Sequence, residues 1–90
     1  MQTNTPENFR KLQEEQLDLF TRKNHDYGNS FEKAIEEDGL IVAKIRLGDK
    51  FNRICSLLKS EASVKDESIK DTLMDLSTYA LMTILTLKDE

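Results

Sequence analysis

Residues 67–88 of the chain read ESIKDTLMDLSTYALMTILTLK, and the predicted architecture follows from this stretch. On a helical wheel its leucines, methionines and isoleucines cover most of the circumference, which is typical of a helix buried on several sides. A chain of 90 residues buries only about 60–68% of its surface on folding, so two further helices cannot easily enclose such a helix. The stretch therefore predicts a helical bundle that is completed by other copies of the chain, as a homodimer or a higher homo-oligomer.

The chain before this stretch also carries helix signals and no strand pattern. Thr5 and Pro6 predict a helix start, because a hydroxyl can cap the first turn and proline is tolerated at its first position. An apolar stripe then runs to about Lys23. Residues 24–30 are dense in turn-forming types and predict a loop, and residues 30–37 predict a short helical turn that ends at Asp38 and Gly39.

A second long helix is expected at about 40–60, ahead of the third at about 67–88. The predicted fold class is all-α, with three main helices and one short helical turn in a single domain that spans residues 1–90. In the alternative interpretation, the turn at 30–37 covers the excess apolar face of the third helix and the chain is a monomer.

The charge balance restricts the partners. The 13 Lys and Arg residues against 17 Asp and Glu residues give a net charge of −4, which argues against a nucleic-acid polymer as partner, because phosphate backbones attract basic surfaces. The single cysteine and single histidine leave carboxylates as metal ligands, which suits Mg²⁺ or Mn²⁺. Charges interrupt every window of about 18 residues, so no membrane span is expected. Because no export signal is recognisable, we expect a cytoplasmic protein.

The second predicted helix carries most of the positive charge. Residues 40–60 contain five cations and one anion. A spacing of i, i+3, i+4 and i+7 places four of these residues on one helix face, where cations can hold phosphate groups: Arg46, Asp49, Lys50 and Arg53. Lys44 belongs to the same basic segment and is a further candidate ligand-binding residue. In the alternative interpretation this face is simply solvated, with Asp49 paired to Arg53.

The third predicted helix carries a stripe of carboxylates at every fourth position: Glu67, Asp71 and Asp75. Anions are expected at a helix N-terminus, but Asp75 lies about two turns into an apolar helix and needs a compensating cation. That cation is either a divalent metal held by all three acids or the basic face of the second helix, through Arg46, Lys50 or Arg53. Three acids of the first helix are expected to face solvent: Glu14, Glu15 and Asp18.

The predicted loop at 24–30 carries polar and aromatic groups that suit a nucleotide. Tyr27 beside Gly28 can stack on a flat ring, and Asp26 and Asn29 can form hydrogen bonds with the edge of a base or with a ribose hydroxyl. In the alternative interpretation these residues only stabilise the turn itself.

Three segments in this order resemble one known family. They are KNHDYGNSF at 23–31, IRLGDKFNR at 45–53 and ESIKDTLMDL at 67–76, the last followed by Tyr79 and Ala80. The pattern resembles the nucleotide modification associated domain 1 family, whose members are small helical proteins frequent in phages and prophages. That family is similar to the all-α nucleoside triphosphate pyrophosphohydrolases of the MazG and dimeric dUTPase type. The resemblance implies a nucleotide-type ligand bound among the three segments.

The leading functional hypothesis is therefore a phage-type protein that binds a phosphorylated nucleotide and sequesters it, including a host immune signalling nucleotide. Arg46, Lys50 and Arg53 would hold phosphates, and Tyr27 would stack on the base. The first alternative is Mg²⁺-dependent pyrophosphohydrolysis of a nucleotide, with the carboxylates of the third helix as metal ligands. The second alternative is a helical adaptor without a ligand.

Overall fold

The computed structural model describes residues 2–59 and 62–87, with side chains at all of these positions except 25–28 and 62–68. It consists of three helices in this part of the chain: α1 (Pro6–Asp38), α2 (Ile41–Leu57) and α3 (Ala62–Leu87). The predicted all-α class is confirmed. Helix α2 ends slightly earlier than expected, and α3 begins before the predicted start at 67.

Helix α1 starts where the sequence predicts. The Thr5 side chain accepts a hydrogen bond from the Asn8 backbone N–H at 3.1 Å, and Pro6 occupies the first turn. This contact satisfies one of the backbone donors that have no partner within the helix.

The predicted loop at 24–30 is wrong, because α1 continues through it as a single helix of 33 residues. The short turn expected at 30–37 is the last part of this helix. Turn-forming residues in a helix cost about 1 kcal/mol or less each, and the burial of Phe31 and Ile35 favours continuing the helix. Packing has thus overridden local preference.

Helix α1 ends at a glycine that redirects the chain. Gly39 has a φ of 87°, and its backbone N–H donates to the Ile35 carbonyl at 2.8 Å. Only glycine adopts this conformation without strain. The predicted end at Asp38 and Gly39 is therefore confirmed.

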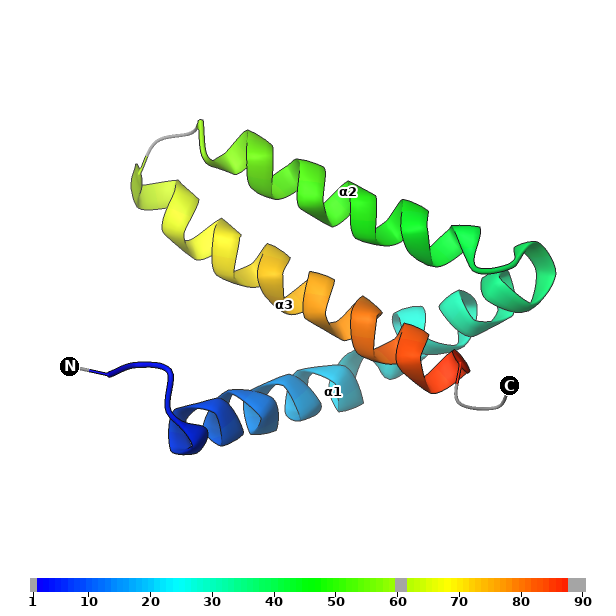
Figure 1. The fold of residues 1–90 in the computed structure, drawn as a ribbon, viewed down its shortest axis with the longest axis horizontal. Coiled ribbons are helices and arrows are strands. Elements are labelled where there is room, and N and C mark those ends of the chain that lie inside the picture. The colour runs from blue at the N-terminus through cyan, green and yellow to red at the C-terminus, as the bar shows by residue number, and fades with distance from the viewer. Residues whose placement is uncertain (1, 60–61, 88–90) are drawn as a thin grey trace.

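The three helices form an open arrangement (Figure 1). Helices α2 and α3 run antiparallel side by side and make the most extensive helix pair, while the N-terminal part of α1 lies on the other side of α3. The C-terminal part of α1 runs on past α3 to the corner where the chain enters α2 (Figure 1). Helix α3 is therefore the central element, as its sequence predicts.

The core lies where the three helices meet. It consists of Phe31, Ile35, Ala43 and Met82, with Phe20, Val42 and Tyr79 packed against it. The rings of Phe31 and Tyr79 meet edge to face, with centroids 5.1 Å apart.

Large apolar side chains remain exposed on all three helices, including Phe9 of α1, Phe51 of α2 and Ile84 of α3. Among the described residues no large side chain is completely buried. This much apolar exposure is expected of a chain that associates with others. Completion of the bundle by self-association stays a prediction.

Candidate functional site

The seam between α2 and α3 contains an ion pair. The Lys50 Nζ lies 3.2 Å from the Asp75 Oδ2, and the side chains are 30% and 41% exposed, respectively. Lys50 thus supplies the cation that Asp75 needs within its apolar helix. The sequence allows two sources for this cation, a divalent metal or the basic face of the second helix. The structure places the second of these, through Lys50, beside Asp75. The pair is half-buried, so both charged groups can still be reached from solvent.

Lys50 is also placed beside an aromatic ring of the core. Its Nζ lies 6.0 Å from the centroid of Tyr79, at the outer limit for a cation–π contact. Tyr79 in turn packs edge to face on Phe31. The ammonium group is therefore fixed by a carboxylate on one side and by the rigid core on another.

Two arginines flank this pair on α2. Arg46 and Arg53 lie one turn before and one turn after Lys50, on the same side of the helix, and both are exposed. In the described part of the chain neither forms an ion pair, so the pairing of Asp49 with Arg53 is not formed. The structure thus brings Arg46, Lys50 and Arg53 together as a row of cations, which we call the α2 cation row.

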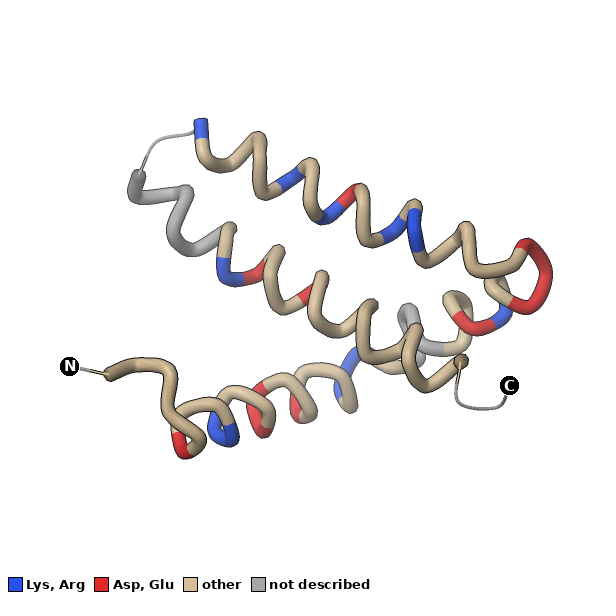
Figure 2. Tube along the Cα trace, in the orientation of Figure 1, with Lys and Arg blue, Asp and Glu red and all other residues tan. Residues whose placement is uncertain are grey.

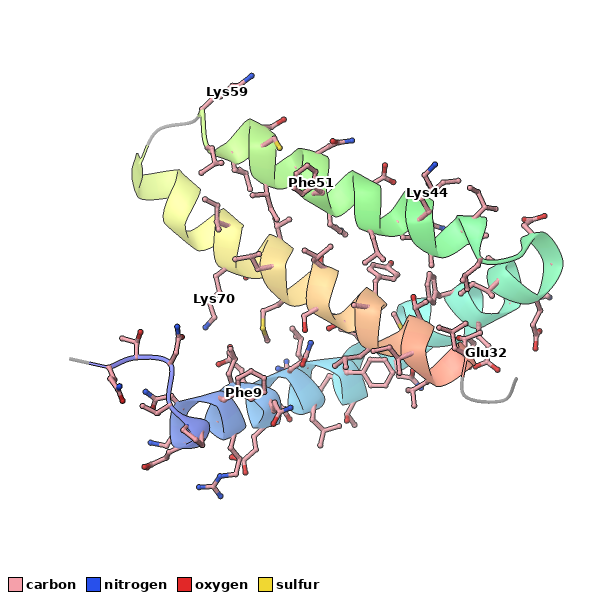
Figure 3. The ribbon with its side chains drawn as sticks, in the orientation of Figure 1. Phe9, Glu32, Lys44, Phe51, Lys59 and Lys70 are labelled. Carbon is pink, nitrogen blue, oxygen red and sulfur yellow. The ribbon has the colours of Figure 1, made fainter. Side chains whose placement is uncertain are left out.

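The other two candidates of the basic segment, Lys44 and Asp49, lie differently relative to the α2 cation row. Lys44 is two residues before Arg46, which at about 100° per residue puts it on the far side of α2, and Figure 3 shows it pointing away from α3. Asp49 is exposed beside the row. Its carboxylate lowers the positive potential there.

The carboxylate stripe of α3 is only partly described. Asp71 is exposed, Asp75 pairs with Lys50, and the side chain of Glu67 lies outside the described residues. No group of three or more acidic, histidine or cysteine side chains arranged to hold a metal occurs among the described residues. Two carboxylates one turn apart suit Mg²⁺ when ligand phosphates and water complete the shell. The metal site at these three acids stays a prediction.

The candidate residues at 24–30 have a different backbone from the one expected. Residues 26–29 belong to the helix α1 rather than to a loop. Asn29 is exposed, while the side chains of Asp26 and Tyr27 lie outside the described residues, as does the environment of Gly28. Their role in base recognition stays a prediction.

Sequence reasoning missed the grooves between α1 and α3. Two adjacent hollows of about 290 and 480 Å³ lie there, with mainly apolar walls. Gln16 borders both, and its amide nitrogen donates to Ser77 Oγ at 2.9 Å and to Thr78 Oγ1 at 3.1 Å. A glutamine within the apolar stripe of the first helix was the signal for this contact.

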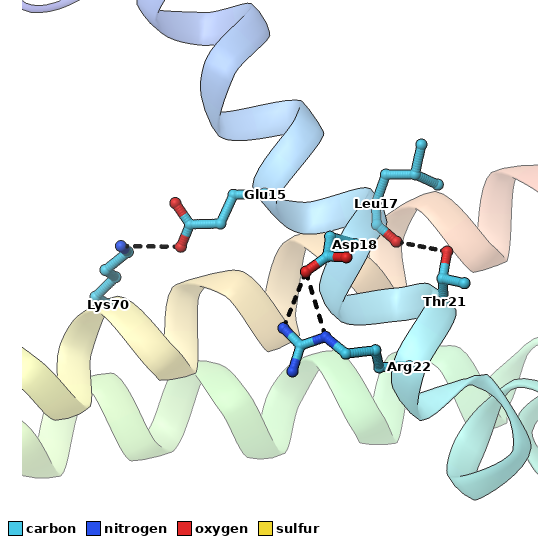
Figure 4. Close-up of polar contacts among 6 residues, drawn as sticks. All are labelled: Glu15, Leu17, Asp18, Thr21, Arg22 and Lys70. Atoms are coloured by element: carbon cyan, nitrogen blue, oxygen red, sulfur yellow. Dashed lines mark hydrogen bonds and ion pairs between the residues drawn. The ribbon is translucent and has the colours of Figure 1, made fainter.

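The acids of α1 have different environments. Glu15 pairs with Lys70 of α3 at 3.0 Å, whereas Asp18 pairs with Arg22 of its own helix at 3.1 Å (Figure 4). All of these side chains are more than half exposed, as the sequence predicts for this cluster. Such pairs contribute little stability, although the Glu15–Lys70 pair does join α1 to α3.

Fold and site together define a small all-α protein with a cation row along the seam of a helical hairpin. A family model, nucleotide modification associated domain 1, matches residues 23–87. The chain therefore belongs to the nucleotide modification associated domain 1 family, which confirms the resemblance seen in the sequence. The comparisons with curated proteins and with solved structures give no match.

The helices also bear on the expectation about membranes. In the described residues no helix combines the length and the apolar character that a bilayer-spanning segment needs.

Proposed function

We propose that this protein binds a phosphorylated nucleotide at the α2 cation row. The observation that carries the proposal is the half-buried Lys50–Asp75 pair between two exposed arginines that form no ion pair in the described part of the chain. Membership of a family described by its association with nucleotide modification supports it. A protein with a net charge of −4 that nevertheless gathers three cations on one surface is suited to a small anion rather than to a polymer.

The three cations would divide the work by their chemistry. The guanidinium groups of Arg46 and Arg53 can each take a phosphate in a bidentate fork, since neither forms an ion pair in the described part of the chain. Lys50 is a compact charge that Asp75 holds in place, and a phosphate beside it would meet an already oriented ammonium. The nucleobase would lie toward α1, where Tyr27 is the predicted stacking residue.

We further propose that the protein sequesters the bound nucleotide without hydrolysing it. Asp75 is already paired with Lys50, so of the two acids of the stripe whose side chains are described, Asp71 alone forms no ion pair. A single carboxylate without an ion pair supports sequestration rather than a complete metal site. Mg²⁺-dependent pyrophosphohydrolysis is the competing proposal. For it Glu67, Asp71 and Asp75 would hold the ion, which when bound polarises a phosphoryl oxygen and activates water. We include in the sequestration proposal that this is a phage-type protein and that the nucleotide is a host immune signalling nucleotide.

A panel of mononucleotides and cyclic dinucleotides tests this function. The protein is incubated with each compound, with and without Mg²⁺, and the free and heat-released fractions are separated by chromatography. Intact nucleotide recovered only after denaturation is the expected result. A product that accumulates only with Mg²⁺ would replace sequestration by hydrolysis.

Matched variants connect the result to the site. Arg53→Gln removes one cation of the row, and Lys33→Gln removes one exposed cation of α1 outside it. We expect the first to weaken nucleotide binding at least about tenfold, as for loss of a charge-assisted contact, and the second to leave it unchanged. Equal affinity of both variants and the wild type would contradict the proposed site, and a failure of every nucleotide to bind would leave the adaptor hypothesis.

A further inference from the structure

The side of α2 that faces away from α3 carries exposed apolar residues that nothing in the described structure covers: Ile41, Ile45, Phe51, Cys55 and Leu58. Exposed polar residues, among them Lys44 and Asn52, lie between them. With Gly48 included, the apolar positions follow a 3–4 spacing along the helix. Such spacing forms the seam of paired helices. We call this side the outer face of α2; Arg46 and Arg53 lie on the opposite side.

A glycine interrupts the outer face at its centre. Gly48 is helical, and a Cβ added there would meet nothing within 4 Å. Glycine is a poor helix former, and no neighbour within the described chain requires its small size. Small residues on a helix face let a second backbone or a large side chain approach closely. Phe51, which is 61% exposed, lies one turn further on the same face.

We propose that the outer face of α2 pairs with the outer face of a second copy, with the two helices antiparallel about a two-fold axis. The centre of the seam is formed by positions 41, 44, 48, 51, 55 and 58, and Ile45 lies at its edge. In an antiparallel pair of such helices, the residue numbers of two facing positions always add up to the same value. Gly48 then faces Phe51 of the second copy, so each glycine notch receives a ring. Ile41 meets Leu58, and Lys44 meets Cys55.

The charges at the two ends of α2 favour this direction. Figure 2 shows acidic residues at the corner where α1 leads into α2 and a basic residue at the far end of α2. These are Glu37 and Asp38 at one end and Lys59 at the other, and all three are exposed. Antiparallel pairing brings each basic end against an acidic corner, and it also opposes the helix dipoles favourably. Parallel pairing would place like charges together.

Lys44 fits the same arrangement. Figure 3 shows its side chain, like that of Lys59, directed away from α3. Its aliphatic stem can cover the Cys55 thiol of the second copy while the ammonium reaches water. The assignment does not depend on the proposed ligand, because the α2 cation row stays open on the other side of the helix.

The first experiment measures mass in solution by light scattering at several concentrations. The wild type is expected as a dimer that dissociates on dilution. Gly48→Gln fills the notch with a better helix former, so the dissociation constant should rise at least roughly tenfold, as when an interface hot spot is lost, while circular dichroism keeps its helical content. A monomeric wild type, or a Gly48→Gln dimer as tight as the wild type, would overturn the pairing; the latter would point to the apolar face of α3.

The second experiment fixes the direction of pairing by oxidation. Positions 44 and 55 of one helix are roughly 16 Å apart along its axis, which is too far for a disulfide within one chain. Lys44→Cys should therefore form covalent dimers through Cys55 of the second copy, and Lys44→Ser should not. Covalent dimers that form equally well in the wild type would indicate a parallel pair and contradict the antiparallel arrangement.

Discussion

Helix α3 contacts its two neighbours through seams of opposite character. Toward α2 it presents Asp75, and the seam is joined by the half-buried pair with Lys50. Toward α1 it presents leucines and methionines, and the seam contains apolar hollows that are bridged by the neutral amide of Gln16. The seam toward α2 is thus joined by charged groups, and the seam toward α1 mainly by apolar ones.

The two seams indicate which charged side chains contribute to the stability of the fold. Cations are distributed over all three helices, but most of the ion pairs in the described structure are more than half exposed and contribute little. Among the side chains that the structure describes, Lys50 alone combines partial burial with an ion-pair partner and an aromatic ring. Substitutions at the junction of the three helices and within each seam test this contrast.

Phe31→Ala should have the largest effect. Phe31 is 3% exposed and forms the edge contact with Tyr79 at the junction of the three helices. Truncation of a buried phenylalanine removes about 3–5 kcal/mol from the free energy of unfolding, which urea titration measures. Phe9→Ala, at an exposed ring of α1, is the control. If both variants lose the same stability, the core is not where we place it.

Gly39→Ala should be next in size. The φ of 87° at the corner between α1 and α2 lies in a region that alanine rarely adopts, and such strain costs about 1–3 kcal/mol. The corner sets how α2 reaches α3, so the charged seam depends on it. In Gly28→Ala the same substitution lies inside the helix α1 and should stabilise the protein by up to about 1 kcal/mol. A destabilised Gly28→Ala would support the loop that the sequence predicted.

This comparison also shows what the sequence could and could not reveal. The start at Thr5, the end at Gly39 and the three helical segments follow from local chemistry, since caps and glycine act within one turn. The continuation of α1 through 24–30 depends on burial of Phe31 against the residues of α2 and α3. Such long-range packing is not encoded in any local window.

Some parts of the candidate site also follow from local spacing in the sequence, whereas others depend on how the helices pack. Helical spacing alone placed Arg46, Lys50 and Arg53 on one face, and the need of Asp75 for a cation pointed to α2. Spacing also shows that Lys44 belongs to another side of the helix, although its presence in the same basic segment suggested otherwise. The grooves between α1 and α3 depend on the angle at which two helices approach, which a sequence pattern does not specify.

Asp75→Ala tests the charged seam. It leaves Lys50 half-buried without its carboxylate, and we expect a loss of about 1 kcal/mol, because remaining solvent screens the ammonium. Asp71→Ala removes an exposed carboxylate one turn away and should change the stability by less than about 0.5 kcal/mol. Thermal unfolding of both variants at low and high salt is the measurement. Equal stability of the two variants would mean that the pair does not hold the seam.

Gln16→Leu tests the apolar seam and should have the smallest effect. The change removes the hydrogen bonds to Ser77 and Thr78 but adds an apolar group to an apolar groove. The Thr78 hydroxyl still donates to the Met74 carbonyl at 2.9 Å, so no buried donor is left without a partner. We expect a change within about 0.5 kcal/mol. A loss several times larger would show that the amide is essential to the contact between α1 and α3.

Chemical-shift mapping by NMR can show which seam of α3 takes the nucleotide. The backbone amides are followed while the tightest-binding nucleotide of the panel is added. We expect the largest shifts at Arg46, Lys50, Arg53 and Asp75, and smaller shifts at Gln16 and Leu81. The largest shifts along the α1–α3 grooves, with none at the α2 cation row, would contradict the proposed site.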